Sequence, residues 1–253
     1  MIHPTAIVES DLPPDASVGP YAVVGTDVEF GSSARIGAHA VIMGPSRFGD
    51  DVSIGPSAVI GTDPQDLKYD GERTELRVGD RTVIREFANI NRGTSSSGRT
   101  VIGTDCLIMA YVHIAHDCLV GDRVILANAV NLAGHVQIGN DVTIGGVVPV
   151  HQFVRVGMHA MIGGGFRINK DIPPFVLASG YPLRVAALNS VGLRRKGFTA
   201  ERLDELDRVF RHLFKSTGIL TGKAAALLSD PDCGEDGAIL ANFVLNSKRG
   251  VIN

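Results

Sequence analysis

The sequence contains no tryptophan, few aromatic residues, only three cysteines and no long apolar run. An odd number of cysteines without a CxxC pair argues against a disulfide framework and predicts reduced core thiols, as in a cytoplasmic protein. No apolar stretch approaches the roughly 18 residues that span a bilayer, and the first residues, MIHPTAIVES, do not resemble a signal peptide. A net charge of −3 argues against nucleic-acid binding, which needs a basic face. We therefore expect a cytoplasmic protein that neither inserts into membranes nor binds nucleic acid.

What the sequence does contain is a repeat with a period of six residues. An aliphatic or phenylalanine residue returns in one phase and breaks only at positions 66, 72 and 96, and a small or β-branched residue often follows four places later. This period indicates a parallel β-helix, because each repeat is too small to bury its own apolar face and must stack on its neighbours. A six-residue spacing does not follow one face of an α-helix. The repeated residues are Val18, Val24, Phe30, Ile36, Ile42, Phe48, Ile54, Ile60, Val78, Ile84, Ile90, Ile102, Ile108, Ile114, Val120, Leu126, Leu132, Ile138, Ile144, Val150, Val156, Ile162 and Ile168.

Three repeats would make one triangular coil, so that residues eighteen apart stack at about the 4.8 Å spacing of a sheet. We expect apolar residues inside the prism and glycine or asparagine at its corners. Two polar stretches interrupt the repeat, GTDPQDLKYDGERTE near 61–75 and NRGTSSSGRT near 91–100, and predict inserted loops. The β-helix should extend over residues 1–175.

After two prolines the pattern changes, and residues 176–253 are expected to form an α-helical domain. Thr199 is a suitable N-cap for a helix whose Leu203, Leu206, Phe210, Leu213 and Phe214 form one apolar stripe. Further helices are predicted near 184–196, 220–228 and 236–247. The predicted fold class is thus an all-β parallel β-helix followed by a helical domain.

Four of the eight histidines gather at one corner when the chain is wound at eighteen residues per coil. His116, His135 and His151 take neighbouring positions in successive coils, with His113 shortly before the first of them. Gly134 stacks directly over His116 in the next coil. Such a cluster can bind zinc, or one imidazole can act as a general base while its neighbours position a substrate.

At these residues the chain resembles the UDP-N-acetylglucosamine O-acyltransferase family, nearly from end to end. The resemblance implies a left-handed β-helix, an exception to the right-handed rule for parallel crossovers. It also implies a cytoplasmic homotrimer with active sites between subunits, which catalyses the first step of lipid A biosynthesis. The matching strings are QDLKYDGE at 65–72, IRE and INRGT within 84–94, HIAHDC at 113–118, LAGHV at 132–136, VHQFVRVG at 150–157, GLRRKGF at 192–198 and the closing SKRGVIN.

The resemblance also implies roles for individual residues. His116 would take the proton from the sugar 3-hydroxyl, with Asp117 supporting it. The activated oxygen would attack the thioester of a 3-hydroxyacyl chain on acyl carrier protein, and the N–H of Gly134 would stabilise the oxyanion. No metal or cofactor is implied. Contacts to sugar, phosphate, acyl group, nucleotide or carrier are implied for Asp66, Lys68, His113, His135, His151, Gln152, Asn189, Arg195 and Lys196.

Gly164, in MIGGGF, matches the position that sets acyl length in the family. A glycine there leaves the groove open and implies a longer acyl chain. Phe166, expected at an inward position two residues later, could itself shorten the groove.

Three departures from the family pattern concern the acceptor: Asn91, Pro182 and Val191 stand where other residues are familiar. An acceptor with a 3-amino group, which would give an amide product, is therefore one alternative. A second is a zinc enzyme like the γ-class carbonic anhydrases, which use three histidines on a similar prism. A non-catalytic hexapeptide-repeat scaffold is a third, although it would leave the gathered histidines unexplained.

Overall fold

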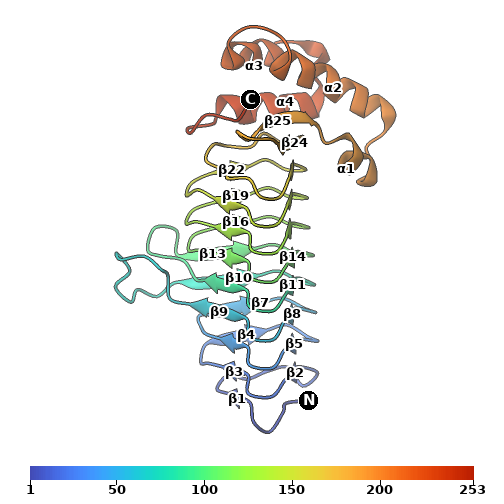
Figure 1. The fold of residues 1–253 in the computed structure, drawn as a ribbon. Coiled ribbons are helices and arrows are strands. Elements are labelled where there is room, and N and C mark those ends of the chain that lie inside the picture. Colours follow the sequence, from blue (N-terminus) through green and yellow to red (C-terminus); the bar gives the residue numbers. More distant parts are fainter.

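The computed structural model describes residues 1–253, and the chain folds as a left-handed parallel β-helix followed by helices (Figure 1). Three parallel sheets form the sides of a triangular prism, and the C-terminal helices lie at one end of it. This confirms the predicted fold class. None of the helices is long and apolar enough to cross a membrane.

The first sheet has eight strands and the second has seven. In spatial order the first sheet contains β1 (Ile7–Val8), β3 (Val23–Val24), β6 (Val41–Ile42), β9 (Val59–Thr62), β12 (Asn89–Asn91), β15 (His113–Ile114), β18 (Asn131–Leu132) and β21 (Pro149–Val150). The second contains β22 (Arg155–Val156), β19 (Gln137–Ile138), β16 (Leu119–Val120), β13 (Arg99–Ile102), β10 (Glu75–Val78), β7 (Ser46–Phe48) and β4 (Val28–Phe30).

The third sheet has ten strands and continues into the C-terminal part of the chain. Its order is β2 (Ser17–Val18), β5 (Arg35–Ile36), β8 (Ser53–Ile54), β11 (Val83–Ile84), β14 (Leu107–Ile108), β17 (Ile125–Leu126), β20 (Thr143–Ile144), β23 (Met161–Ile162), β24 (Val176–Ser179) and β25 (Arg184–Leu188). All pairs are parallel except β24 with β25.

The six-residue period fills the core as expected. Ile114, Leu132 and Val150, eighteen residues apart, pair in register and are all buried. The residue four places after a repeated one also points inward, as Val124 and Val136 show with no exposed surface. One continuous apolar core therefore extends along the prism.

We expected glycine or asparagine at the corners of the prism, but other residue types occupy many of them. At the corners the backbone adopts positive φ at non-glycine residues, including Asp117 (60°), His135 (62°) and Phe153 (62°). The glycines that follow the inward residues instead allow the backbones of neighbouring coils to lie close together. A Cβ on Gly37 would lie 2.6 Å from the backbone nitrogen of Pro56 in the next coil.

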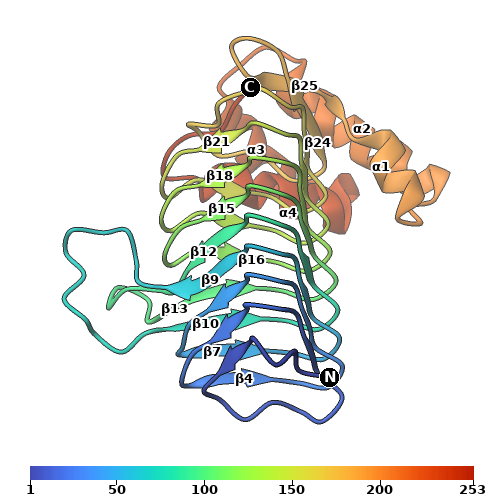
Figure 2. The same cartoon turned by 60° about the horizontal axis from the view of Figure 1, so that its bottom comes forward.

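Both inserted loops leave the prism at the same edge. Residues 63–74 connect β9 to β10, and residues 92–98 connect β12 to β13, so each passes from the first sheet to the second. The longer loop reaches far out from the prism (Figure 2). The segment His113–Cys118 makes the same passage between β15 and β16, and we call this side of the prism the histidine edge.

The C-terminal part corrects one prediction. Instead of a helix over 184–196, strand β25 pairs with β24, and helix α1 (Ser190–Arg195) follows. β25 is the last strand of the third sheet, and Val185 is its one buried residue. The division between residues 175 and 176 stays a prediction.

The remaining helices are α2 (Ala200–Phe214), α3 (Leu220–Leu228) and α4 (Gly234–Leu245), with a short 3-10 turn at Pro231–Cys233. Thr199 caps α2 by accepting the N–H of Arg202, as predicted. The stripe of α2 is buried, except that Phe214 is only partly so. The three cysteines are buried and unpaired.

Candidate active site

The catalytic pair expected at His116 and Asp117 lies on the histidine edge, directly after β15. Gly134 follows β18 one coil further along, so the register places it against His116. A Cβ on residue 134 would lie 2.6 Å from Cε1 of His116 and 2.7 Å from its Nε2. Only glycine leaves room for the imidazole at this distance. The stacking predicted from the eighteen-residue coil is therefore present.

Asp117 is fully buried and holds four hydrogen bonds. Its Oδ2 lies 2.7 Å from Nδ1 of His116 and accepts the Thr94 hydroxyl at 2.6 Å. Its Oδ1 accepts the Thr94 N–H at 3.0 Å and the Ser97 hydroxyl. A carboxylate with this many donors is satisfied although it is shielded from water.

These contacts fix the protonation of the pair. Burial alone raises the pKa of Asp117, but hydrogen bonds from Ser97, Thr94 and His116 outweigh burial and hold the pKa below its ordinary value of 3.8. The carboxylate is therefore ionised at neutral pH and requires a proton on Nδ1 of His116. In the neutral imidazole Nε2 then carries the lone pair, which suits it to act as a base.

Thr94 and Ser97 were not among the predicted site residues. Both come from the loop at residues 92–98, where the sequence showed only a run of small polar residues. The available signal was a serine- and threonine-rich insertion beside the histidine cluster in the wound chain. The loop's hydroxyls act on Asp117 and, through it, orient His116.

We expect the double substitution Thr94→Val with Ser97→Ala to lower turnover about tenfold, the scale of a lost hydrogen bond to a charged group. The pKa of Asp117 should rise toward its ordinary value. Because the wild-type pKa is below 3.8, the ionised carboxylate stabilises the fold above about pH 4, and this contribution is lost as pH falls through the folded-state pKa. Urea unfolding should therefore separate the variant from wild type at pH 7 and much less near ~pH 3.

Ser96→Ala is the matched control, because the Ser96 side chain forms no hydrogen bond, whereas Thr94 and Ser97 on either side of it bond to Asp117. Equal losses in the control and the double variant would contradict a role through Asp117.

His113 connects the longer loop to the prism. Its Nδ1 lies 2.8 Å from Oδ1 of Asn89, and the same oxygen accepts the amide of Gln65 at 3.4 Å. Burial lowers the pKa of His113 below 6.5, so the ring is neutral at pH 7. Asp66 and Lys68 follow Gln65 in this loop, where Oδ1 of Asp66 accepts the N–H of Lys68 at 3.0 Å.

Asn91, one of the departures from the family pattern, joins the two loops. Its buried amide donates to the hydroxyl of Thr62 at 3.0 Å and to the carbonyl of Asp63 at 2.8 Å. This residue therefore fixes the bases of the loops, and a histidine there would have to replace both contacts.

His135, His151 and Gln152 continue the histidine edge away from His116. The ring of His135 stacks on Phe153 with centroids 4.5 Å apart and meets the ring of His116 edge-on at 5.2 Å. His151 and Gln152 lie one coil further, where the N–H of Phe153 bonds to the carbonyl of Gly134. The edge is thus a column of polar and aromatic side chains over three coils.

The other predicted residues lie elsewhere in the same chain. Gly164 lies against Gly146, on the edge between the third and first sheets. Asn189 caps α1 and donates to the carbonyl of His159, while Lys196 pairs with Asp141 at 2.7 Å. These contacts are on the edge between the second and third sheets. Arg195 ends α1 and is exposed.

Phe166 is half-buried and lies outside the core, which corrects the prediction of an inward position. Its ring instead covers Gly163, where an added Cβ would meet Cε2 of Phe166 at 2.9 Å. The repeat has weakened by this point, because three successive glycines precede the phenylalanine.

The residues that could bind zinc at the histidine edge are His116, Asp117 and His135, whose potential ligand atoms lie within 4.8 Å of one another. However, Nδ1 of His116 and Oδ2 of Asp117 are 2.7 Å apart, closer than the roughly 3.3 Å that separates two ligands of tetrahedral zinc. Both Asp117 oxygens also accept hydroxyl protons. The three residues fit a hydrogen-bonded acid–base pair better than a metal site.

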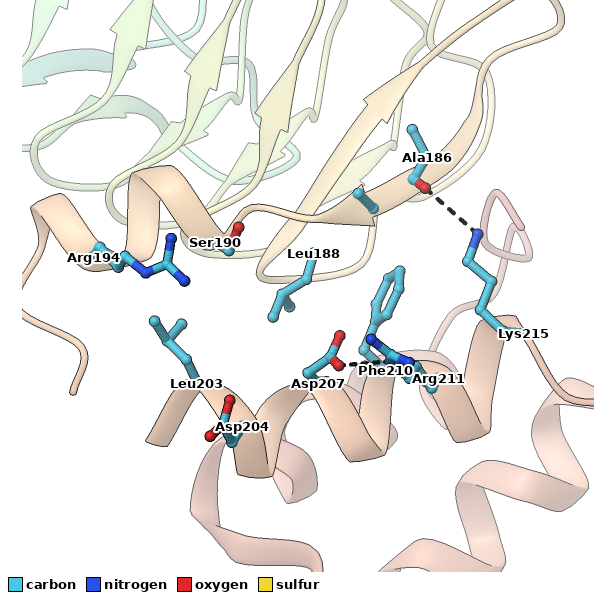
Figure 3. Close-up of a pocket in the computed structure, with 11 residues that line it drawn as sticks. Ala186, Leu188, Ser190, Arg194, Leu203, Asp204, Asp207, Phe210, Arg211 and Lys215 are labelled. Carbon is cyan, nitrogen blue, oxygen red and sulfur yellow. Dashed lines mark hydrogen bonds and ion pairs between the residues drawn. The ribbon is translucent and has the colours of Figure 1, made fainter. Parts of the chain in front are cut away.

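A cavity of about 590 Å³ lies at the histidine edge and is lined by Asp117, His135 and Phe153 among others. This volume suits a small-molecule ligand. A second cavity, of about 510 Å³, lies between β25, α1 and α2 (Figure 3). In it Arg211 pairs with Asp207, and Lys215 bonds to the carbonyl of Ala186. The second cavity contains none of the predicted catalytic residues.

Comparison with known proteins gives matches over the whole chain. A family model described as domain 2 of UDP-N-acetylglucosamine O-acyltransferase matches residues 171–252. A second model, described as bacterial transferase hexapeptide and made of six repeats, matches residues 99–134. The acyl-[acyl-carrier-protein]–UDP-N-acetylglucosamine O-acyltransferase of Verminephrobacter eiseniae is 46% identical, over 99% of this chain and 98% of its own. The protein of the same name from Herminiimonas arsenicoxydans is 44% identical, over 100% and 99%.

Solved structures with the same family name also match the whole chain. The UDP-N-acetylglucosamine acyltransferase of Bacteroides fragilis is 36% identical with a TM-score of 0.97, and each chain is covered completely. That of Campylobacter jejuni is 40% identical with a TM-score of 0.94, covering 100% of this chain and 99% of its own.

Proposed function

The chain belongs to the UDP-N-acetylglucosamine O-acyltransferase family and is an acyltransferase, and we propose that it transfers a 3-hydroxyacyl chain from acyl carrier protein to the 3-hydroxyl of UDP-N-acetylglucosamine. The observation that carries this proposal is the His116–Asp117 pair beneath Gly134. The reaction would be the first step of lipid A biosynthesis. A cytoplasmic location is part of the proposal, and the unpaired thiols favour it.

In the proposed reaction Nε2 of His116 takes the proton of the sugar 3-hydroxyl as that oxygen attacks the thioester carbonyl carbon. Asp117 stabilises the imidazolium that forms, through the bond to Nδ1. When the tetrahedral intermediate collapses, the carbon–sulfur bond breaks and the imidazolium returns the proton to the leaving thiolate. The products are the sugar ester and the free carrier thiol.

The N–H of Gly134 is a suitable donor to the oxyanion of that intermediate. Gly134 is buried, and its N–H donates to no acceptor in the chain, although both neighbouring N–H groups, of Ala133 and His135, are bonded. A buried donor left free within reach of the base is what oxyanion stabilisation requires.

The direct test is mass spectrometry of the product formed from mixed 3-hydroxyacyl carrier thioesters and UDP-sugars. We expect an ester of UDP-N-acetylglucosamine that mild base cleaves. A base-stable amide of a 3-amino sugar would favour the alternative acceptor. Hydrolysis of the thioester without any acylated sugar would refute the proposed function.

We further propose a homotrimer with the site between subunits. His116 lies between the first and second sheets, whereas Gly164 and the residues around α1 lie at the two other edges of the same prism. One chain cannot bring these residues to one substrate, but a neighbouring chain could supply Gly164, Asn189 and Arg195. Light scattering should give three times the chain mass of 26.8 kDa.

Acyl length is proposed to depend on Gly164, which is exposed and has no side chain to close a groove. Gly164→Met should shift preference toward shorter chains, because each methylene excluded from an apolar groove costs about 0.8 kcal/mol. Two excluded methylenes would change the ratio of products roughly tenfold in a competition between carrier thioesters. Gly164→Ala should give a smaller shift in the same direction. An unchanged preference in the methionine variant would exclude this position as the length determinant.

A further inference from the structure

The shorter of the two inserted loops, residues 92–98, holds the catalytic pair with little packing of its own. Residues 95–97 are exposed, although the hydroxyls of Thr94 and Ser97 bond to the buried carboxylate of Asp117. An exposed loop loses conformational entropy when it is ordered, and only its contacts offset that loss. The placement of these hydroxyls therefore depends on the hydrogen bonds that fix the backbone of the loop.

Three successive backbone N–H groups of the shorter loop have three different acceptors. That of Thr94 donates to Oδ1 of Asp117 at 3.0 Å, and that of Ser96 donates to the hydroxyl of Thr94 at 3.2 Å. The N–H between them, of Ser95, donates at 2.9 Å to Oε1 of Glu72, which belongs to the longer loop at residues 63–74. The shorter loop is thus held by two carboxylates, one from the prism and one from the longer loop.

Glu72 is itself fixed within the longer loop. Its Oε2 accepts the N–H of Asp70 at 2.9 Å, and its backbone carbonyl accepts the hydroxyl of Tyr69 at 3.2 Å. The N–H groups of Asp70 and Ser95 hold the pKa of Glu72 below its ordinary value of 4.5, so that the side chain is ionised at neutral pH. Glu72 therefore places one carboxylate oxygen on each loop and joins the two by charge-assisted hydrogen bonds.

Other contacts hold the first part of the longer loop. The guanidinium of Arg92 donates to the carboxylate of Asp63 and, at 2.8 Å, to the hydroxyl of Tyr69. Asp66 and Lys68, the proposed substrate contacts of this loop, lie between those two anchors in the sequence. Loss of the carboxylate link to the shorter loop would therefore leave this part in place.

We propose that Glu72 is a positioning residue for the catalytic pair. It fixes the N–H of Ser95 and with it the turn whose two hydroxyls bond to Asp117. Asp117 in turn orients His116. Glu72 does not line the cavity at the histidine edge, so its effect on the reaction passes through the shorter loop. This inference rests on the proposed function.

Glu72→Ala should lower kcat about fivefold, the scale of one hydrogen bond, and leave KM unchanged for both UDP-N-acetylglucosamine and the carrier thioester. The loss should be smaller than that of Thr94→Val with Ser97→Ala, because Glu72 acts only through the loop that carries them. Steady-state kinetics with each substrate varied in turn measure these quantities. A raised KM for the nucleotide sugar with an unchanged kcat would place Glu72 in acceptor recognition and overturn the proposal.

Two further variants separate the hydrogen bond from the charge. Glu72→Gln keeps an oxygen that can accept the N–H of Ser95 and should lower kcat less than about twofold. A loss as large as that of Glu72→Ala would mean that the charge matters instead, which would overturn the proposal. Asp70→Ala is the matched control, because it removes a negative charge from the same loop, the side chain is exposed, and only the backbone N–H bonds to Glu72. It should turn over like wild type.

Combining the variants tests the route of the effect. Residues that act independently lower turnover by the product of their separate factors. Added to Thr94→Val with Ser97→Ala, the change Glu72→Ala should cause little further loss, because the hydroxyls that it positions are already gone. A further fivefold loss would mean that Glu72 acts on the reaction by another route, and the proposal would be wrong.

Hydrogen exchange tests the contact without turnover. Backbone amides of residues 92–98 should exchange faster in Glu72→Ala than in wild type, because the N–H of Ser95 has lost its acceptor and the turn opens more often. Asp70→Ala should match wild type. Unchanged exchange in Glu72→Ala would overturn the proposal. If wild type failed to acylate the sugar at all, the proposed function would fail, whereas this difference in exchange could still be measured.

Discussion

His116→Ala should lower turnover by a factor of about 10² to 10⁴, the range that a general base contributes. The imidazole is the group on the histidine edge that combines a free Nε2 with a carboxylate on Nδ1. Substrate affinity should change little, because His113, His135 and Gln152 remain in place. Steady-state kinetics, together with direct titration of UDP-N-acetylglucosamine, would separate the two quantities.

His212→Ala serves as the control, since His212 is exposed on α2 and far along the chain from the histidine edge. Near wild-type turnover in a folded His116→Ala protein would mean that another group takes the proton. The mechanism would also be contradicted if wild-type turnover were lost on removal of metal and restored by added zinc.

Gly134→Ala should be almost as damaging, although it removes no functional side chain. The new methyl group would lie 2.6 Å from Cε1 of His116, too close for any real contact, and the imidazole would have to move. A displacement of about 1 Å at a reacting group costs on the order of 10²-fold in rate. We expect kcat to fall by about that factor, with the fold retained.

The control is Gly222→Ala, in α3, where an added Cβ meets nothing within 4 Å. Alanine is favoured over glycine in helices by up to about 1 kcal/mol, and Gly222 is in the first turn of α3, so this variant should be fully active and no less stable. If Gly134→Ala kept its activity, His116 would have to tolerate a shift that the proposed proton transfer does not allow. A crystal structure of the variant would show where the ring goes.

The coil and its core could be predicted because a six-residue period leaves little freedom in which residues face inward. The contact between Gly134 and His116 followed from the same spacing. Winding the chain at eighteen residues per coil works wherever no residue is inserted, as between His113 and Asn131. Across an insertion the spacing no longer predicts which residues pair in neighbouring coils. Asn89 and His113, for example, pair although they are 24 positions apart.

The remaining features depend on the path of loops and ends. The bonds from Thr94 and Ser97 to Asp117 depend on how a short insertion folds back, which no periodicity describes. The helix expected over 184–196 is partly a strand, because pairing with β24 outweighs the local helix propensity of RVAAL. The position of the last residues against the prism depends on a backbone pairing between Asp171 and Val251, which are far apart in sequence.

That both insertions leave from the histidine edge bears on how such an enzyme can change its specificity. Each coil is held by the ladders of its neighbours: the pairing of β9 with β12, where both insertions begin, shifts register only between Ile90 and Asn91, and the next pairing, of β12 with β15, is regular. The stretch 63–74, with Asp66 and Lys68, is an insertion between two strands of the regular coil, β9 and β10. The length and sequence of this loop, Glu72 apart, can therefore change while the coil that carries His116 stays as it is.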